Sequence, residues 1–210
     1  TLGRGGSDTS AVAVAAALSC PCDIYTDVDG VYTTDPRIES RARRLNKVSF
    51  EEMLEMASLG AKVLQTRSVE LAMAKQVPVR VLSSFIEPDE SGQMPDKGGT
   101  LICDEEEIVE KRIVSGVTMS RDEARITLLG LSDRVEAPAD VFTRLAEASV
   151  NVDMIVQSQA RSEGAVNLTF TTGRRDAARA ADLVRAAQDK LGFEEIRVDQ
   201  DVAKVSVVGV

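Results

Sequence analysis

The order of elements predicted for the second half of the chain permits few folds. Residues 125–131 alternate as a half-buried strand does, and residues 138–148 are predicted as a helix with Pro138 near its first turn. The elements that follow are predicted strands at 152–157, 166–171 and 195–198 and an Ala-rich amphipathic helix at 175–191. This βαββαβ order over about 75 residues is the ferredoxin-like arrangement.

The first half of the chain has the pattern of an α/β domain. Residues 7–18, rich in Ala and Val, predict a buried helix that is capped by Ser7 or Asp8. Ser49 and Glu52 have capping-box spacing at the start of a second helix, which runs to about residue 59. The remaining predicted elements are a helix at 61–75 and strands at 22–26, 79–82 and 100–102. This order indicates the back half of an α/β sandwich.

Two further predicted strands lie outside the βαββαβ unit. Residues 113–119 precede it and residues 202–210 follow it, and both are interpreted as the start of another small domain. The acidic run at 104–107 marks a change of composition, and we interpret it as a solvated junction rather than a metal site. Residues 87–99, rich in Pro, Asp, Ser and Gly, predict an exposed loop or hairpin.

The composition excludes several kinds of chemistry. The 210 residues contain no His, which excludes a Ser-His or Cys-His nucleophile pair, a His-ligated zinc and an imidazole base. The net charge of -9 argues against nucleic-acid partners and against an anionic membrane surface. No apolar run has the roughly 18 residues that a membrane helix needs. Any catalysis must therefore use carboxylates, hydroxyls, Lys, Arg and backbone amides.

The three cysteines do not form a recognisable metal or redox motif. Cys20 and Cys22 are separated by one residue, and the sequence offers no second pair and no His. We predict no metal site built by the protein, and we expect the cysteines to be buried as small apolar residues. That use of cysteine fits a reducing compartment, so the predicted location is cytoplasmic.

Two loops carry side chains suited to charged ligands. Residues 3–8, Gly-Arg-Gly-Gly-Ser-Asp, lead into a helix whose N-terminal amides attract anions, and an Arg there can hold a carboxylate or phosphate. Residues 26–37, Thr-Asp-Val-Asp-Gly-Val-Tyr-Thr-Thr-Asp-Pro-Arg, follow a strand end, where α/β sheets place their ligands. Their hydroxyls and carboxylates could serve a nucleotide and its Mg²⁺. Taken singly, each pattern also fits an ordinary turn or surface loop.

With a third segment, these loops resemble the aspartokinase branch of the amino-acid kinase family. That segment is Gly-Ala-Lys-Val-Leu-Gln at 60–65, and the βαββαβ unit resembles the first regulatory ACT domain of the same enzymes. The resemblance implies an α/β fold, namely the C-terminal half of an amino-acid-kinase α/β/α sandwich followed by a ferredoxin-like ACT domain. It assigns residues 1–107 to the kinase domain and 123–200 to the first ACT domain. Residues 108–122 become a connection with the first strand of a second ACT domain, and residues 201–210 its truncated continuation.

The resemblance also implies a reaction, the ATP-dependent phosphorylation of the L-aspartate side-chain carboxylate to 4-phospho-L-aspartate. The cofactor would be ATP with Mg²⁺, and the product would enter lysine, threonine and methionine biosynthesis. Arg4 would grip a substrate carboxylate, with Ser7 and Asp8 near the reacting centre. The positions that match nucleotide contacts are Thr26, Asp27, Tyr32, Thr33, Thr34, Asp35, Pro36, Arg37 and Lys62. Phosphoryl transfer relies on positioning and charge neutralisation, so the missing His is no obstacle.

One part of the family pattern has no counterpart in these residues. The Lys-Phe-Gly-Gly phosphate loop, with the Lys that neutralises the transferring phosphoryl group, does not occur in the sequence. We interpret the chain as a fragment and expect it to have no kinase activity by itself.

For the second half, the resemblance implies feedback regulation by lysine and/or threonine. ACT domains bind such effectors at interfaces, so a homodimer or an α2β2 assembly is expected. The effector-contacting positions match Asp133, Asn151, Asp153 and Gln157, whose side chains can pair with an ammonium group or satisfy polar groups. The order Glu136-Ala137-Pro138 departs from the family, in which Gly commonly follows the Pro, and this leaves the effector's identity open.

Two other functions remain open at this point. A non-catalytic amino-acid-sensing subunit would not need the kinase loops at 1–37. A uridylate or glutamate kinase would not need the ACT-like second half. The two features together favour a feedback-regulated aspartate kinase.

Overall fold

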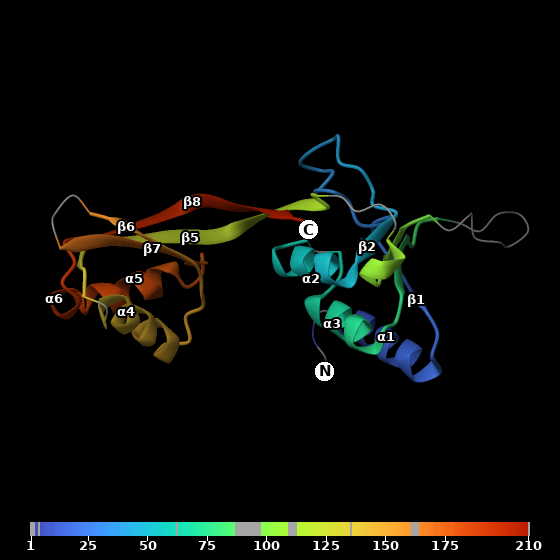
Figure 1. Ribbon diagram of the computed structural model, residues 1–210, viewed down its shortest axis with the longest axis horizontal. Coiled ribbons are helices and arrows are strands. Elements are labelled where there is room, and N and C mark those ends of the chain that lie inside the picture. The colour runs from blue at the N-terminus through green and yellow to red at the C-terminus, as the bar shows by residue number, and fades with distance from the viewer. Residues whose placement is uncertain are drawn as a thin grey trace, which may run out of the picture. The chain divides into compact units, whose positions relative to one another are not determined.

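The computed structural model describes residues 3, 5–61, 63–86, 98–108, 113–134, 136–160 and 164–209. The chain divides into two compact units, one formed by residues 1–119 with 205–210 and the other by residues 120–204. Figure 1 labels most of the helices and strands of both units. Among the described residues, no helix is long and apolar enough to cross a membrane.

The first unit is a four-stranded sheet packed with three helices. Its elements are α1 (Gly6–Leu18), β1 (Cys22–Thr26), β2 (Lys47–Ser49), α2 (Phe50–Ser58), α3 (Thr66–Lys75), β3 (Val79–Ser83), β4 (Thr100–Cys103) and the 3₁₀ turn η1 (Glu105–Glu107). The strand order is β1-β3-β4-β2, in which β1 is parallel to β3 and β2 is parallel to β4, while β3 and β4 are antiparallel. The carboxyl ends of β1 and β3 therefore meet at the same edge of the sheet.

The core of this unit explains why these segments form helices. Val12 of α1, Met53 of α2 and Ala72 of α3 are each 0% exposed and pack with the apolar residues of β1 and β3. Helix α3 contacts both α1 and α2. Because each helix buries one apolar stripe against the same sheet, the three form one layer.

The local sequence predicts the first residue of one helix correctly and those of two others incorrectly. The capping box predicted for α2 is confirmed, because Ser49 Oγ accepts from the Glu52 amide at 3.1 Å and the Glu52 carboxylate accepts from the Ser49 amide at 3.1 Å. The predicted capping of α1 by Ser7 or Asp8 is wrong. Its N-cap is Gly5, and no side chain caps the helix. The helix predicted at 61–75 begins only at Thr66, since the backbone is left-handed at Gly60 and extended at Gln65.

The second unit has the predicted ferredoxin-like order. Its elements are β5 (Gly116–Ser132), α4 (Glu136–Glu147), β6 (Val152–Gln159), β7 (Ala165–Gly173), α5 (Ala177–Arg185), α6 (Gln188–Leu191) and β8 (Glu195–Val208). The strand order is β6-β7-β5-β8, and β7 is antiparallel to both β5 and β6. Helices α4 and α5 cover one face of this sheet (Figure 1). Ile126, Leu128 and Phe170 are 0–1% exposed beneath them, and Phe142 meets Phe170 edge to face at 5.7 Å.

Two sequence expectations need correction, and a third cannot be compared with the described residues. The separate strands predicted at 113–119 and 202–210 continue into those at 125–131 and 195–198, giving the uninterrupted β5 and β8. The single helix predicted at 175–191 ends at Arg185, and α6 follows after two residues. The loop predicted at 87–99 lies outside the described residues except for its last two positions.

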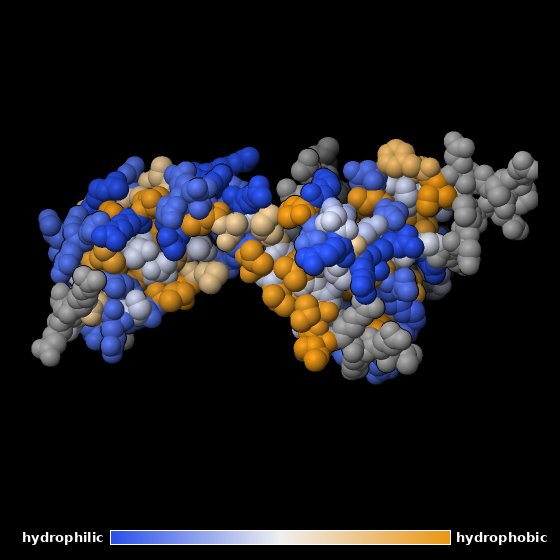
Figure 2. All heavy atoms as spheres, turned by 90° about the horizontal axis from the view of Figure 1, so that it is seen from above, coloured by the Kyte–Doolittle hydropathy of each residue, from blue (hydrophilic) through white to orange (hydrophobic). Residues whose placement is uncertain are grey.

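The cysteine expectation is correct for two residues of three. Cys22 and Cys103 are buried, whereas Cys20 is exposed beyond the end of α1. Burial raises the pKa of both buried thiols, so they remain neutral at pH 7. Figure 2 shows that apolar atoms reach the surface of each unit among polar ones, as is usual for folded proteins.

Candidate active site

The first predicted loop leads into the N-terminus of α1. Gly5 adopts a left-handed backbone conformation with φ +72°, which glycine alone tolerates without strain. The Gly6 amide donates to the Gly3 carbonyl at 3.2 Å, which closes a tight turn before the helix. Because no side chain caps α1, its first turn presents backbone amides and the positive end of the helix dipole.

The side chains of Ser7 and Asp8 lie in the first turn of α1. Ser7 Oγ donates to Asp8 Oδ1 at 3.2 Å, and this pair is exposed to solvent. Arg4, predicted to grip a substrate carboxylate, lies outside the described residues, as does Lys62. The predicted roles of these four residues therefore stay predictions.

The structure brings the first loop against the third matching segment. A Cβ atom placed on Gly5 would lie 1.8 Å from Cγ of Gln65, so the two residues are packed in contact. Gln65 is the N-cap residue of α3, and its carbonyl accepts from the Ser68 hydroxyl at 2.7 Å. Gly5 and Gln65, which are 60 positions apart in the sequence, are thus neighbours in space.

The second predicted loop begins at the carboxyl end of β1. Thr26 Oγ1 donates to Asp27 Oδ1 at 3.2 Å. The Thr26 carbonyl accepts from both the amide and the hydroxyl of Ser84, at 2.8 and 3.0 Å. Ser84 comes directly after β3, so it shares the sheet edge at which parallel strands of α/β proteins place ligands. Ser84 was not among the predicted site residues, although its position after a predicted strand was the available signal.

The hydroxyl of Tyr32 is oriented by a charged side chain of the same loop. Its hydroxyl donates to the Asp29 carboxylate at 3.0 Å, and the same carboxylate pairs with Arg44 at 3.0 Å. Partial burial and the hydrogen bond to Asp29 raise the pKa of Tyr32, so the phenol stays protonated near neutral pH.

A buried hydroxyl joins the two ends of this loop. Thr100 Oγ1 is 0% exposed; it accepts from the Val31 amide at 2.8 Å and lies 2.5 Å from the Leu45 carbonyl. The Leu45 amide in turn donates to the Val31 carbonyl at 2.8 Å. Residues 32–44 therefore project from a closed base, and Thr100 was not among the predicted site residues.

Backbone pairing and one ion pair order the middle of the loop. The Thr33 amide donates to the Arg43 carbonyl at 2.9 Å, and the Arg43 amide donates to Thr33 Oγ1 at 3.1 Å. Arg37 binds Asp35 through Nε at 3.0 Å and Nη2 at 2.9 Å, although its side chain is 85% exposed. Thr34 and Pro36 lie between these contacts in the same loop. The guanidinium of Arg37 retains its second amino group for another partner.

The Arg37–Asp35 pair leads to a testable pH effect. The hydrogen bonds from Arg37 lower the pKa of Asp35. We expect Arg37→Gln to raise the Asp35 pKa toward the ordinary value of about 3.9, as measured by carboxyl ¹³C NMR titration. Because the pKa of Asp35 is lower in the folded state, its pairing with Arg37 contributes to the free energy of unfolding. This contribution is fully present above the unfolded-state pKa and is lost as pH falls through the folded-state pKa.

The chain offers a matched control for this titration. Arg41 binds Glu39 in the same two-pronged way, at 3.0 and 3.1 Å, and lowers the pKa of Glu39. Arg41→Gln should raise the pKa of Glu39 and leave that of Asp35 unchanged. An unchanged Asp35 pKa in Arg37→Gln would contradict the pairing.

Two of the four predicted effector residues, Asp153 and Gln157, lie on β6 of the second unit, and the other two lie beyond its opposite ends. Asp133 follows β5, where its amide donates to the Gly164 carbonyl at 3.1 Å, whereas Asn151 precedes β6. The pairing registers place these two positions at opposite ends of β6, beside Gly164 and Thr172 and so roughly 26 Å apart at about 3.3 Å per residue. Asp153 and Gln157 lie between them on this exposed strand. One small amino acid cannot touch Asp133 and Asn151 of the same unit.

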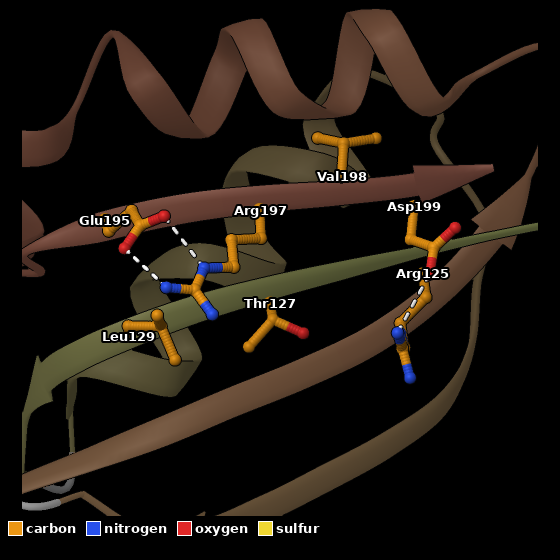
Figure 3. A pocket seen from close by; sticks show the side chains of 7 residues that line it. All are labelled: Arg125, Thr127, Leu129, Glu195, Arg197, Val198 and Asp199. Carbon is orange, nitrogen blue, oxygen red and sulfur yellow. Dashed lines mark hydrogen bonds and ion pairs between the residues drawn. The ribbon is translucent and has the colours of Figure 1, made fainter.

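A shallow pocket of about 570 Å³ lies on the second unit, between β5 and β8. Figure 3 shows that Arg197 turns onto Glu195 of its own strand, whereas Arg125 extends to Asp199. The two ion pairs measure 2.8 and 2.9 Å. Both arginines already have carboxylate partners, so this pocket carries no free charge for an anion, and none of the predicted site residues lines it.

Comparison with known proteins identifies relatives of the chain. The model of the amino acid kinase family matches residues 1–83. The aspartokinase of Pseudomonas aeruginosa is 50% identical over 213 residues, which cover 100% of this chain and 49% of that protein. Over its whole length the chain is similar to aspartokinases. It spans about half the length of the curated relatives that it matches.

Solved aspartokinase structures show the same architecture. Escherichia coli aspartokinase III, in complex with aspartate and ADP, has a TM-score of 0.72 and 35% identity, covering 100% of this chain and 44% of that one. Its complex with lysine and aspartate has a TM-score of 0.72 and 33% identity, with the same coverage. The predicted fold class is confirmed, half of an amino-acid-kinase α/β sandwich followed by a ferredoxin-like ACT domain. The predicted domain limits of 107, 123 and 200 stay predictions.

Proposed function

We propose that the full-length protein containing this chain is an aspartate kinase that transfers the γ-phosphoryl group of ATP to the side-chain carboxylate of L-aspartate. The observation that carries the proposal is the glycine loop at the uncapped start of α1, packed against Gln65 in a chain similar to aspartokinases. An aspartokinase of known structure was solved with aspartate and ADP, which supports the same ligands here.

The chemistry matches the groups that this site offers. A carboxylate oxygen of aspartate forms the new bond to phosphorus, and the bond from the γ-phosphorus to the bridging oxygen of ADP breaks. The attacking carboxylate is already ionised at neutral pH, so no general base is required. The N-terminus of α1 supplies backbone amides and the positive end of the helix dipole, which stabilise the negative charge of the transferring phosphoryl group. Arg4 would hold the substrate carboxylate, and Asp8 with Ser7 would orient charged groups around the reacting centre.

The nucleotide is proposed to lie along the loop that begins at Thr26. Mg²⁺ would arrive with ATP and prefers oxygen ligands, largely phosphate and water. Asp29 and Asp35 are already bound by Arg44 and Arg37, so we favour Asp27 as the carboxylate of this loop that takes part. The remaining nucleotide contacts proposed are Tyr32, Thr33, Thr34, Pro36, Arg37 and Lys62.

The second unit is proposed to sense lysine and/or threonine. The solved complex of an aspartokinase with lysine supports this class of effector. Since Asp133 and Asn151 lie at opposite ends of β6, we propose that the effector site is completed by a second ACT domain in a homodimer or α2β2 assembly. A non-catalytic sensing subunit is the weaker alternative, because the family model matches residues 1–83.

The proposal is tested by substrate-dependent ADP release from the full-length protein. L-aspartate should stimulate release from ATP, whereas L-glutamate and UMP should not. Stimulation by glutamate or UMP alone would assign the protein to another branch of the amino-acid kinases. Binding of lysine or threonine without any ADP release would favour the sensing subunit.

A further inference from the structure

One ammonium group in the second unit is shared by two carboxylates from different strands. Lys204 of β8 donates a hydrogen bond to Asp153 Oδ2 on β6 and lies 3.6 Å from Glu123 Oε1 on β5. The side chains of Lys204 and Glu123 are 16% and 13% exposed, whereas that of Asp153 is 55% exposed. Asp153 is thus the open member of a half-buried cluster.

The charges in this cluster do not balance. Two carboxylates and one ammonium leave a surplus negative charge, and the pKa of Lys204 is raised, chiefly by its hydrogen bond to Asp153, so it stays charged at neutral pH. The ion pairs Arg125–Asp199 and Arg197–Glu195, also on β5 and β8, each join one cation to one acid. A second cation approaching the cluster from solvent would therefore meet Asp153 first.

Lys204 also has an alternative partner within reach. The residue of β7 opposite Glu123 is Gly173, which has no side chain to stand between β5 and β6. The lysine stem is flexible, so its ammonium can leave Asp153 and remain paired through Glu123. Glu123 is held in place by the Ser120 hydroxyl at 3.4 Å.

We propose that Lys204 is an internal substitute for the ammonium group of an amino-acid effector. Its ammonium group binds Asp153, and an incoming effector ammonium displaces it onto Glu123. This inference rests on the proposed function, in which Asp153 contacts lysine or threonine. Two arrangements with different partners for the same cation form a two-state element that a ligand can bias.

The displaced residue lies on a strand that leads into the first unit. Lys204 is the last residue of the second unit, and four residues later Val208 is 0% exposed within the core of the first unit. The Val208 carbonyl accepts from the Ser115 amide at 2.9 Å. Effector binding at Asp153 thereby acts on β8, whose final residues are anchored in the unit that carries the kinase loops.

The test compares two substitutions that should act in opposite directions. In the full-length protein, isothermal titration calorimetry with L-lysine and with L-threonine gives the dissociation constant of each variant. Lys204→Met removes the internal competitor and should tighten binding by about 2- to 5-fold, the range of a partly exposed ion pair. Glu123→Gln removes the alternative partner and should weaken binding by about the same factor.

A matched control separates competition from a general change of charge. Arg125→Met removes a cation from β5 that is paired with Asp199, and it should leave effector affinity unchanged. Equal tightening in Arg125→Met, no change in Lys204→Met, or shifts of the same sign in the first two variants would overturn the inference. If the wild-type protein phosphorylates aspartate yet binds neither amino acid, this inference and the proposed regulation fail together while the proposed kinase activity stands.

Discussion

Gly5→Ala is expected to lower kcat/KM for aspartate phosphorylation by about 100-fold in the full-length protein that contains this chain. The new methyl group would lie 1.8 Å from Gln65 Cγ, so either Gln65 or the start of α1 must move. A shift of about 1 Å in a group that positions substrate costs about two orders of magnitude in rate. Steady-state ADP release at varied aspartate measures the effect.

Two further variants separate the Gly5–Gln65 contact from backbone strain. Gly3 has φ +74°, and no atom lies within 4 Å of a Cβ added to it. Gly3→Ala therefore measures backbone strain alone and should lower the free energy of unfolding by about 1–2 kcal/mol. Gly5→Ala should cost about 1–3 kcal/mol more because of overpacking. Gln65→Gly in the Gly5→Ala background should restore most of the activity. Wild-type kcat/KM in Gly5→Ala would show that this loop is not part of the active site.

Thr100→Val is expected to lower the free energy of unfolding by about 2–4 kcal/mol, although valine has nearly the same shape. The substitution leaves the Val31 amide and the Leu45 carbonyl buried without their partner, at about 1–3 kcal/mol each. For a protein of this size the melting temperature should fall by roughly 5–15 °C, measured by calorimetry. Since these groups close the base of the loop at residues 32–44, which we propose binds the nucleotide, the KM for ATP should also rise.

Thr118 provides the control for this substitution. Within the described part of the chain, its Oγ1 is the buried side-chain oxygen that has no hydrogen-bond partner. Thr118→Val should therefore either raise the free energy of unfolding or change it by no more than about 0.5 kcal/mol. Equal losses in Thr100→Val and Thr118→Val would mean that the Thr100 hydrogen bonds do not hold the loop.

Local patterns were sufficient for much of the fold. The strand Cys22–Thr26 and the capping box at Ser49 and Glu52 have the predicted limits and contacts, because both depend on neighbouring residues. The βαββαβ order was predictable for the same reason. The continuous strands β5 and β8 were not, since polar residues such as 120–123 read as a break although long strands tolerate them.

The site depended more on distant contacts. The glycine loop and the loop after Thr26 could be picked out from residue types and family resemblance. Thr100 could not, because its hydroxyl serves groups 55 and 69 positions away in the sequence. Lys204 was not predicted as a site residue for the same reason, because its partner Asp153 is 51 positions away. Gly5 belongs to the predicted ligand loop at residues 3–8, but its contact with Gln65 becomes evident only in the folded chain.

We propose that phosphoryl transfer to aspartate takes place at the N-terminus of α1. The most direct measurement is hydroxylamine trapping of the acyl phosphate formed from ATP and L-aspartate by the full-length protein. Wild type and Asp23→Asn, which alters an exposed carboxylate of β1, should both give the hydroxamate, and Asp8→Asn should reduce its formation by about 100-fold. No hydroxamate from the wild type, or full activity in Asp8→Asn, would contradict the account.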